Sequence, residues 1–412
     1  MNHPQRRVVI TGIGAVAPNG IGKEAYWKAT CKGVSGIKPV QRFSTADLPV
    51  QVAGEITDFS LDGVIDRKLA KRTDRVTHFA LVAIHEALAD AKLVLQEENP
   101  RRVGAVIAST LGGVEYVLSE FAAMLRDGPR AMSAYTAIAW LQVANVGQTS
   151  IRYGIQGYSK APVNDLAGGL DALGMAAGAI RRGAAEIIIT GGSEAMIHPF
   201  TFLVLARKGH IMAGADPNAY RPFDCRAAGL VMAEGAGICI LEEYEHARRR
   251  GAPIYGEIVG YGQTNDAHAL ASAPSDGKYY ARALKQALRE GNIRPDEVGY
   301  VSADGRALPG ADQGEAEALR LTFGERLAAL PVSIPRTATG HSYAAAGALD
   351  AITALLALQH GCIPPTLNCE ELDPRYGLDV VRGEGRPFSR PVVLLGGRST
   401  GGANVAVAIR KI

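Results

Sequence analysis

An internal repeat restricts the folds open to this chain more than any other feature. The segment Gly169–Leu173 opens an Ala/Gly-rich stretch that ends near Gly183, and Ala348–Ile352 opens a similar stretch that ends near Gly361. We predict that both stretches are helices. Each is followed by a β-branched run with a glycine pair, namely Ile187–Gly192 and Val392–Gly397. A repeated helix–strand unit of this kind predicts two similar halves that pack back to back.

Strand-like and helix-like runs also alternate elsewhere, which predicts an α/β fold with covered sheets. The clearest runs are Val8–Thr11, Arg75–Asp90, Val103–Ser109, Gly168–Arg182 and Glu186–Thr190. We place the boundary between the halves near Pro253, after the charged segment Glu242–Arg250, which divides the chain into residues 1–252 and 253–412.

The predicted helices of the repeat are rich in small residues, such as Gly174, Ala176, Ala177 and Gly178. Small side chains let one backbone approach another closely. These helices are therefore expected between the sheets rather than on a solvent-facing surface.

The charge balance narrows the classes of function. The 412 residues include 44 basic and 41 acidic side chains, and a net charge of +3 does not suit a protein that binds nucleic acid by neutralising phosphates. Only the short apolar run Val8–Ile10 follows the charged start Met1–Arg7, so neither a signal peptide nor a membrane span is predicted. We expect a cytoplasmic protein with no nucleic-acid or membrane partner.

No cofactor or metal ion is expected from the motifs. The five cysteines are scattered and form no CxxC pair, which argues against a disulfide framework or a zinc site. The turn Gly12–Gly14 follows the first predicted strand, but the next glycine is Gly20, so the dinucleotide-binding fingerprint is incomplete.

Five segments, in family order and spread over nearly the whole chain, resemble the β-ketoacyl-acyl carrier protein synthase family. They are residues 8–20, 221–237, 302–319, 339–347 and 399–406. The resemblance implies a thiolase-like fold, in which duplicated halves form a five-layer α/β/α/β/α core, and it implies obligate dimerisation.

Active members of that family use a cysteine nucleophile, two histidines that stabilise an enolate, a nearby lysine and a gating phenylalanine. The cysteine position matches Leu166, which has no nucleophilic atom. The first histidine position matches Asp304, whose ionised carboxylate only accepts hydrogen bonds and would repel an enolate. The lysine and phenylalanine positions match Arg336 and Thr400, and the second histidine is retained as His341. These positions predict a degenerate site without catalysis.

Residues 139–154, 167–173 and 302–305 resemble the chain length factors of type II polyketide synthases. This likeness implies a non-catalytic subunit that pairs with a catalytic β-ketoacyl synthase paralogue. It also implies an acyl carrier protein partner with a phosphopantetheine-bound polyketide chain. We expect the interface to include the strand after Gly183 and the apolar segment Val114–Phe121.

Three apolar residues in that segment are candidates for the wall of a substrate tunnel. Val114, Val117 and Phe121 have the i, i+3, i+7 spacing of one helix face. The resemblance implies that they limit product length, with Phe121 closing the tunnel. An ordinary apolar interface stripe would show the same spacing.

A basic run provides a candidate docking surface for the carrier protein. Lys68, Lys71 and Arg72 have the spacing of one helix face, and the matching face binds the acidic carrier in catalytic relatives. A solvated surface helix is the alternative.

Two other functions stay open at this point. The alternatives are a decarboxylase or hydrolase that acts on carrier-bound malonyl or acyl groups through His341, and a homodimeric acyl-binding scaffold. For His341 we expect a structural hydrogen bond instead, and Asp304 and Arg336 are candidates for a buried ion pair.

Overall fold

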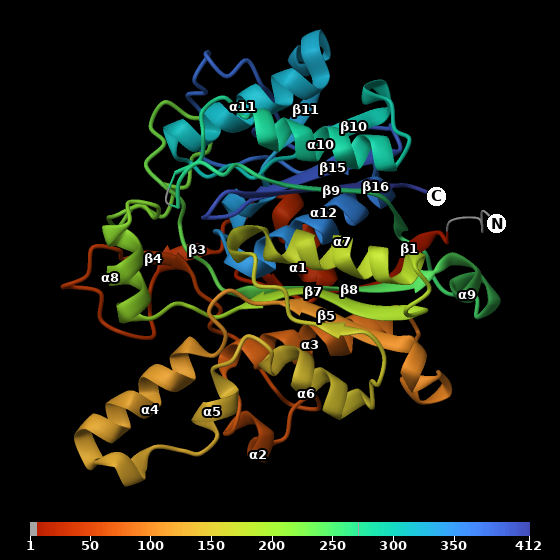
Figure 1. Cartoon of the computed structure of the whole chain (residues 1–412). Helices are drawn as coiled ribbons and strands as arrows, with labels where there is room; N and C mark the ends of the chain where they lie inside the picture. Colours follow the sequence, from red (N-terminus) through yellow and green to blue (C-terminus); the bar gives the residue numbers. More distant parts are fainter. Residues whose placement is uncertain (1–5, 271) are drawn as a thin grey trace.

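The computed structural model describes residues 6–270 and 272–412, which form five layers of alternating helices and sheets (Figure 1). Helices α3 (Arg75–Asp90) and α6 (Ala144–Tyr153) cover one outer face. Helices α7 (Gly168–Arg181) and α12 (Ala346–His360) fill the centre, and α10 (Lys278–Glu290) and α11 (Pro309–Phe323) cover the other face. The predicted α/β/α/β/α arrangement is confirmed.

The strand pairing shows the duplication directly. One sheet has the order β6-β5-β7-β8-β1 and the other β11-β10-β15-β16-β9, with the same sequence of two parallel and two antiparallel pairings. Among the described residues, the sheets are joined by two residue pairs between β1 and β9, Val9 with Glu257 and Ile10 with Gly256. The strands are β1 (Val8–Ala17), β5 (Val103–Ala108), β6 (Ser159–Lys160), β7 (Ile187–Glu194), β8 (Gly235–Glu243), β9 (Gly256–Asn265), β10 (Val298–Ser302), β11 (Pro331–Ser333), β15 (Val392–Arg398) and β16 (Ala403–Arg410).

Shorter elements decorate this core. They are β2 (Gly20–Ile21), α1 (Lys23–Cys31), β3 (Ile37–Pro39), β4 (Val52–Gly54), α2 (Arg67–Ala70), α4 (Val114–Asp127), α5 (Thr136–Ala139), α8 (Pro199–Arg207), α9 (Tyr244–Arg249), β12 (Cys362–Ile363), β13 (Asp379–Val380) and β14 (Arg386–Pro387). Strand β13 extends the second sheet beside β11. Helices α4 and α5 project from the layers at the lower left of Figure 1.

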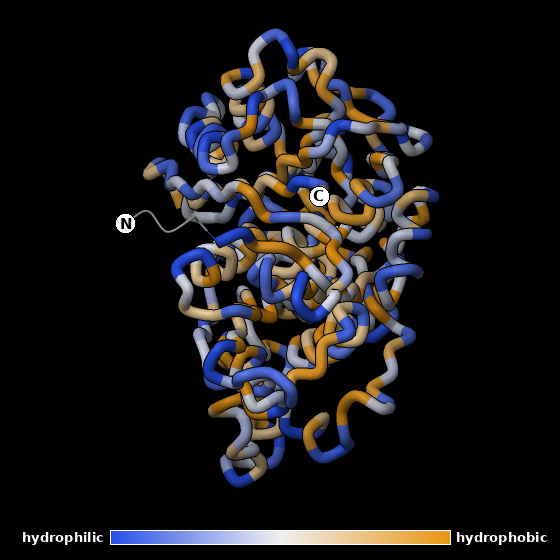
Figure 2. Tube along the Cα trace, turned by 90° about the vertical axis from the view of Figure 1, so that its right-hand side faces the viewer, coloured by the Kyte–Doolittle hydropathy of each residue, from blue (hydrophilic) through white to orange (hydrophobic). Residues whose placement is uncertain are grey.

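The two central helices are buried between the sheets, as their small residues predict, and apolar stretches run through the middle of the molecule (Figure 2). Different glycines permit the close contact, however. A Cβ on Gly169 would lie 2.5 Å from the Ala344 carbonyl oxygen, and one on Gly347 would lie 2.7 Å from Leu170. Gly174 instead packs under the ring of Tyr261.

The expected interface strand is wrong. The strand after Gly183 is β7, which is fully buried and pairs with β5 on one side and β8 on the other. Its backbone groups are satisfied within the chain, so it cannot pair with a partner. The edge of this sheet is β6, whose residues Ser159 and Lys160 are exposed and pair only with β5 in the part of the chain that the structure describes.

Within the described residues, no helix combines the length and the apolar character needed to cross a membrane.

Candidate functional site

Leu166 lies in a short 3-10 turn, Asp165–Ala167, immediately before α7. Its side chain is only 4% exposed and packs into an apolar cluster, which we call the Leu166 cluster. Members of this cluster include Met196, Phe202, Tyr220, Met232 and Tyr343. A position that would suit a thiol at a helix N-terminus is therefore occupied by hydrocarbon packing.

The structure brings Thr400 to the same place. The backbone N–H of Thr400 donates to the Asp165 carboxylate over 3.0 Å. Asp165 has φ of +46°, in the left-handed region that non-glycine residues seldom adopt, and it directs its carboxylate toward this loop. The positions matched to the nucleophile and to the gating phenylalanine thus adjoin, although neither has kept its side chain.

Asp304 follows strand β10 and is fully buried among three arginines, which we call the arginine cluster. Its carboxylate lies 2.9 Å from Arg336 Nη1, 2.9 Å from Arg306 Nε and 3.4 Å from Arg398 Nε. Burial alone would raise the pKa of Asp304, but the three guanidiniums outweigh burial and hold this pKa well below its usual range. The structure thus contains the predicted pair of Asp304 and Arg336 and adds two further cations.

Arg336 connects this cluster to helix α12 and to His341. Its Nε donates to Asp350 over 3.1 Å, and its Nη2 forms a second, short contact with the same carboxylate. Its Nη1 lies 2.9 Å from His341 Nε2. Since arginine has no acceptor, a hydrogen bond between these two atoms requires Nε2 to be the acceptor.

The other ring nitrogen of His341 also faces a donor. The backbone N–H of Tyr343 points at Nδ1 over 3.1 Å. Burial and, next, the charge of Arg336 lower the pKa of His341 well below its usual value, so the ring is neutral. A neutral imidazole has one acceptor nitrogen, so only one of these two contacts is a hydrogen bond. In either tautomer Nε2 lies against Arg336 and Nδ1 lies against the Tyr343 N–H, which favours the structural role.

The sequence interpretation missed three members of this network. Arg306, Asp350 and Glu315 were not singled out, yet Glu315 accepts the backbone N–H groups of Asp304 at 2.8 Å and Gly305 at 2.9 Å. A signal was present in Asp350, because a carboxylate inside an apolar, Ala/Leu-rich helix must find a partner when buried.

An open groove of about 670 Å³, the α4 groove, lies beside the candidate tunnel helix. Val117, Phe121 and Met124 of α4 line one side, and Met132, Ser133 and Trp140 belong to the opposite side. We call the opposite segment, residues 129–140, the outer wall.

The three tunnel candidates take different positions. Val117 is only 8% exposed and lies at the base of the groove, and Phe121 lines the groove at 46% exposure. Val114 does not line it and packs instead against the Leu166 cluster. Helical spacing puts all three on one face of α4. The N-terminal part of that face packs against the Leu166 cluster at Val114, and the part from Val117 to Phe121 lines the groove.

Two glycines hold the start of α4 beneath the outer wall. A Cβ on Gly112 would lie 2.1 Å from the Trp140 carbonyl oxygen, and one on Gly113 would lie 2.1 Å from that of Ala139. Gly112 also has φ of +63°, which glycine adopts without strain.

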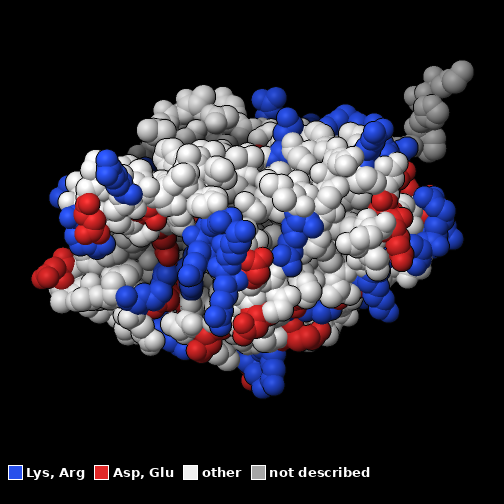
Figure 3. Space-filling model, turned by 90° about the horizontal axis from the view of Figure 1, so that it is seen from below, with Lys and Arg blue, Asp and Glu red and all other residues white. Residues whose placement is uncertain are grey.

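The predicted basic helix face is shorter than expected. Helix α2 ends at Ala70, so Lys71 is its C-cap and Arg72 lies beyond it. Lys68 and Lys71 are exposed. Helix α2 lies at the bottom of Figure 1, and Figure 3, which views the molecule from below, shows Lys and Arg side chains gathered on that side. Arg72 is partly buried and lies 4.5 Å above the ring of Tyr135 in the outer wall.

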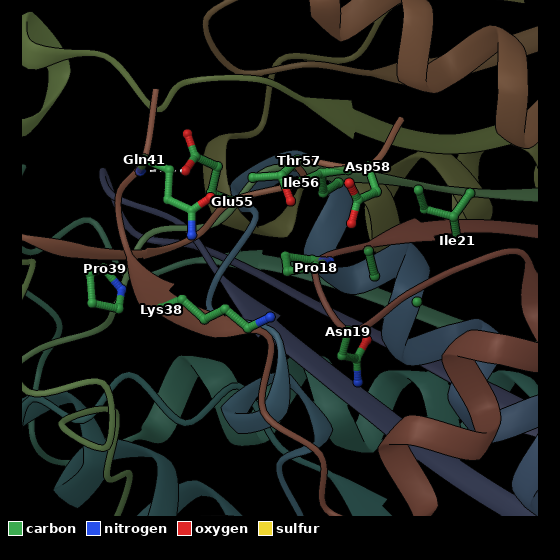
Figure 4. A pocket seen from close by; sticks show the side chains of 12 residues that line it. Pro18, Asn19, Ile21, Lys38, Pro39, Gln41, Glu55, Ile56, Thr57 and Asp58 are labelled. Carbon is green, nitrogen blue, oxygen red and sulfur yellow. Dashed lines mark hydrogen bonds between the residues drawn. The ribbon is translucent and has the colours of Figure 1, made fainter. Parts of the chain in front are cut away.

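A separate polar pocket of about 270 Å³ opens between the β1–β2 turn and strand β3 (Figure 4). Asn19, Lys38 and Asp58 line it, and the Gln41 backbone N–H donates to Glu55 over 2.8 Å. None of the predicted site residues lies there.

Comparisons with known proteins agree with this geometry. The family model "Beta-ketoacyl synthase, N-terminal domain" matches residues 5–247, and "Beta-ketoacyl synthase, C-terminal domain" matches residues 255–370. The chain is 40% identical over 406 residues to the tetracenomycin polyketide synthase ketoacyl synthase beta subunit of Streptomyces glaucescens, with 98% of each chain covered. It is 39% identical over 408 residues to the actinorhodin polyketide putative beta-ketoacyl synthase 2 of Streptomyces coelicolor, again with 98% of each covered.

Solved structures resemble it over nearly its full length. The ishigamide ketosynthase/chain length factor superposes with a TM-score of 0.92 at 29% identity, covering 99% of this chain and 100% of that one. A type II polyketide synthase acyl carrier protein in complex with its ketosynthase bound to the hexaketide gives a TM-score of 0.90 at 29% identity, with the same coverage.

Proposed function

Because this chain belongs to the β-ketoacyl synthase family, we propose that it is a chain length factor, the non-catalytic subunit of a type II polyketide synthase. One observation carries the proposal: the family scaffold is intact, but Leu166 replaces the nucleophile and the arginine cluster encloses Asp304. The Asp304 carboxylate has no donor to offer an enolate oxygen and would repel its negative charge. The similarity to a ketoacyl synthase beta subunit supports the same role.

We propose that a catalytic, cysteine-bearing synthase paralogue covers the face that carries β6 and the α4 groove. Large apolar side chains are exposed on or near these elements. They include Leu125 at 83%, Val163 at 59%, Ile138 at 55% and Trp140 at 49%. Exposed apolar groups in such number favour a protein interface over open solvent.

Within the assembled complex, the α4 groove is proposed to receive the growing chain from the partner's active site. Its sides are mainly apolar, as suits an acyl chain, and Val117 forms its base. The acyl carrier protein would bring the chain by its phosphopantetheine arm. Lys68 and Lys71 are proposed to contact this acidic protein in the cytoplasm.

The assembly can be tested with a built-in probe. The sequence has two tryptophans, and the structure places Trp27 in the core at 9% exposure while Trp140 is half exposed at the groove. In a Trp27→Phe variant, adding the catalytic paralogue should shift Trp140 emission to the blue and reduce its acrylamide quenching roughly threefold, since an interface excludes solvent from its centre.

The matched control is Trp140→Phe, in which the remaining Trp27 should show no change on mixing. Size-exclusion chromatography would run in parallel and should show a one-to-one complex. Separate elution of two folded chains at micromolar concentration, with unchanged Trp140 quenching, would refute the proposed assembly.

A further inference from the structure

The outer wall of the α4 groove is held at its C-terminal end by the Gly113 N–H, which donates to the Trp140 carbonyl oxygen over 3.1 Å, and in its middle by side chains of α4 that contact Ser133. The Glu120 carboxylate accepts the backbone N–H of Ser133 over 2.5 Å. The Tyr116 hydroxyl donates to Ser133 Oγ over 3.2 Å. Neither Tyr116 nor Glu120 lines the groove, so both act on it only through the opposite wall.

Little packing supports the outer wall between its ends. Ala131, Ala134, Tyr135, Ala137 and Ile138 are all exposed. A segment with few buried contacts opens at low free-energy cost, so its position depends on the few polar contacts it makes. Arg72 over Tyr135 is a further contact of this kind.

The α4 side, in contrast, is anchored firmly at its first turn. The buried Asp74 carboxylate accepts the backbone N–H of Tyr116 at 2.7 Å and that of Val76 at 2.8 Å, which joins the starts of α4 and α3. Arg42 also binds both carboxylate oxygens of Glu115, at 3.0 Å each. A change in groove width therefore has to come from movement of the outer wall.

We propose that Tyr116 and Glu120 are positioning residues that set the width of the α4 groove, and thereby the length of polyketide chain it admits. This inference rests on the proposed function and extends it to residues outside the lining. Without the two contacts to Ser133 the middle of the wall moves outward more readily, although Trp140 stays bonded to Gly113, and the groove accepts longer chains less selectively.

The test uses the complex reconstituted with its catalytic paralogue, acyl carrier protein and malonyl units, with products sized by mass spectrometry. In Tyr116→Phe/Glu120→Ala, the fraction of products longer than the native one should rise roughly fivefold, as expected when hydrogen bonds that hold one conformation are removed. Tyr116→Phe/Glu120→Gln keeps an amide oxygen that can accept from Ser133, and it should recover much of the native distribution.

The matched control is Arg126→Ala, which removes an exposed pair with Asp127 on the same helix and should leave product lengths unchanged. If Tyr116→Phe/Glu120→Ala keeps native lengths while a lining substitution at Val117 shortens them, the inference is wrong and the proposed function stands. If neither changes product length, the proposed function itself fails.

A variant that does not assemble is still informative as a free chain. In the Trp27→Phe background, Tyr116→Phe/Glu120→Ala should raise acrylamide quenching of Trp140 above that of the Arg126→Ala control, because Trp140 ends the loosened wall. Equal quenching in the two folded variants would overturn the inference.

Discussion

A complex that carries Val117→Trp should make chains shorter than the native product by at least one two-carbon unit. Val117 lies at the base of the α4 groove and is the buried residue of α4, so a larger side chain has no space other than the groove itself. Packed surroundings resist an added ring, and a growing chain cannot compress it. Mass spectrometry of the carrier-bound products measures the change.

Two neighbours on the same helix face provide the comparison. Phe121→Ala removes a side chain that lines the groove, and it should allow longer products. Val114→Ala should leave lengths unchanged, since Val114 packs against the Leu166 cluster outside the groove. Unchanged lengths for Val117→Trp in an active, assembled complex would contradict the proposed role of the α4 groove, because α4 would then contribute only interface packing.

Replacing Asp304 should cause a large loss of stability. Asp304→Ala leaves Arg306, Arg336 and Arg398 without their shared counter-ion in a buried site, and breaking a buried pair in this way costs about 3–5 kcal/mol. Urea unfolding would measure the free energy, with Arg126→Ala as a surface control expected to change it by less than about 1 kcal/mol. A loss for Asp304→Ala no larger than that of the control would contradict the buried network.

Replacing the Asp304 carboxylate also alters the response of stability to acid. Because the folded state holds the pKa of Asp304 below that of the unfolded chain, about 3.9, its stabilising contribution is complete above that pH. The contribution is lost as the pH falls further toward the folded-state value. The stability difference between native chain and Asp304→Asn should therefore shrink below about pH 4.

Much of the fold follows from patterns that the sequence displays. The small-residue helices and the glycine-paired strands of the repeat predict the central layer and the duplicated sheets, because both features can be read directly from the residue types in each copy of the repeat. The edge strand does not follow in this way. Strand β6 is two exposed residues long, so it has no apolar alternation to mark it, whereas the longer β7 looks like an interface strand until its pairing on both sides is known.

The sequence likewise predicts some residues of the site and misses others. The motifs place Asp304 and Arg336 in one site because each matches a family position. Asp350 joins them only through three-dimensional packing, in which a carboxylate of α12 meets the loop after β11. Arg306 lies two residues after Asp304, but its spacing alone does not show that its side chain turns back to that carboxylate. Helical periodicity likewise puts Val114 and Val117 on one face, but it does not identify which neighbour packs against each of these two residues. Spacing also does not show whether a charged side chain is free on the surface. Arg72 has the spacing of a docking face, but it stacks on Tyr135.

The central claim is that this subunit shapes a product that its partner makes. Intact-protein mass spectrometry of the working complex, supplied with malonyl-loaded acyl carrier protein, tests it most directly. We expect acyl mass on the catalytic partner alone, and none on this chain. In Leu166→Cys, the restored thiol should still yield no condensation by this subunit, because Asp304 and the arginine cluster remain in place of the enolate-binding histidine. Stoichiometric acyl mass on the native chain, or condensation by this subunit without its partner, would contradict the account.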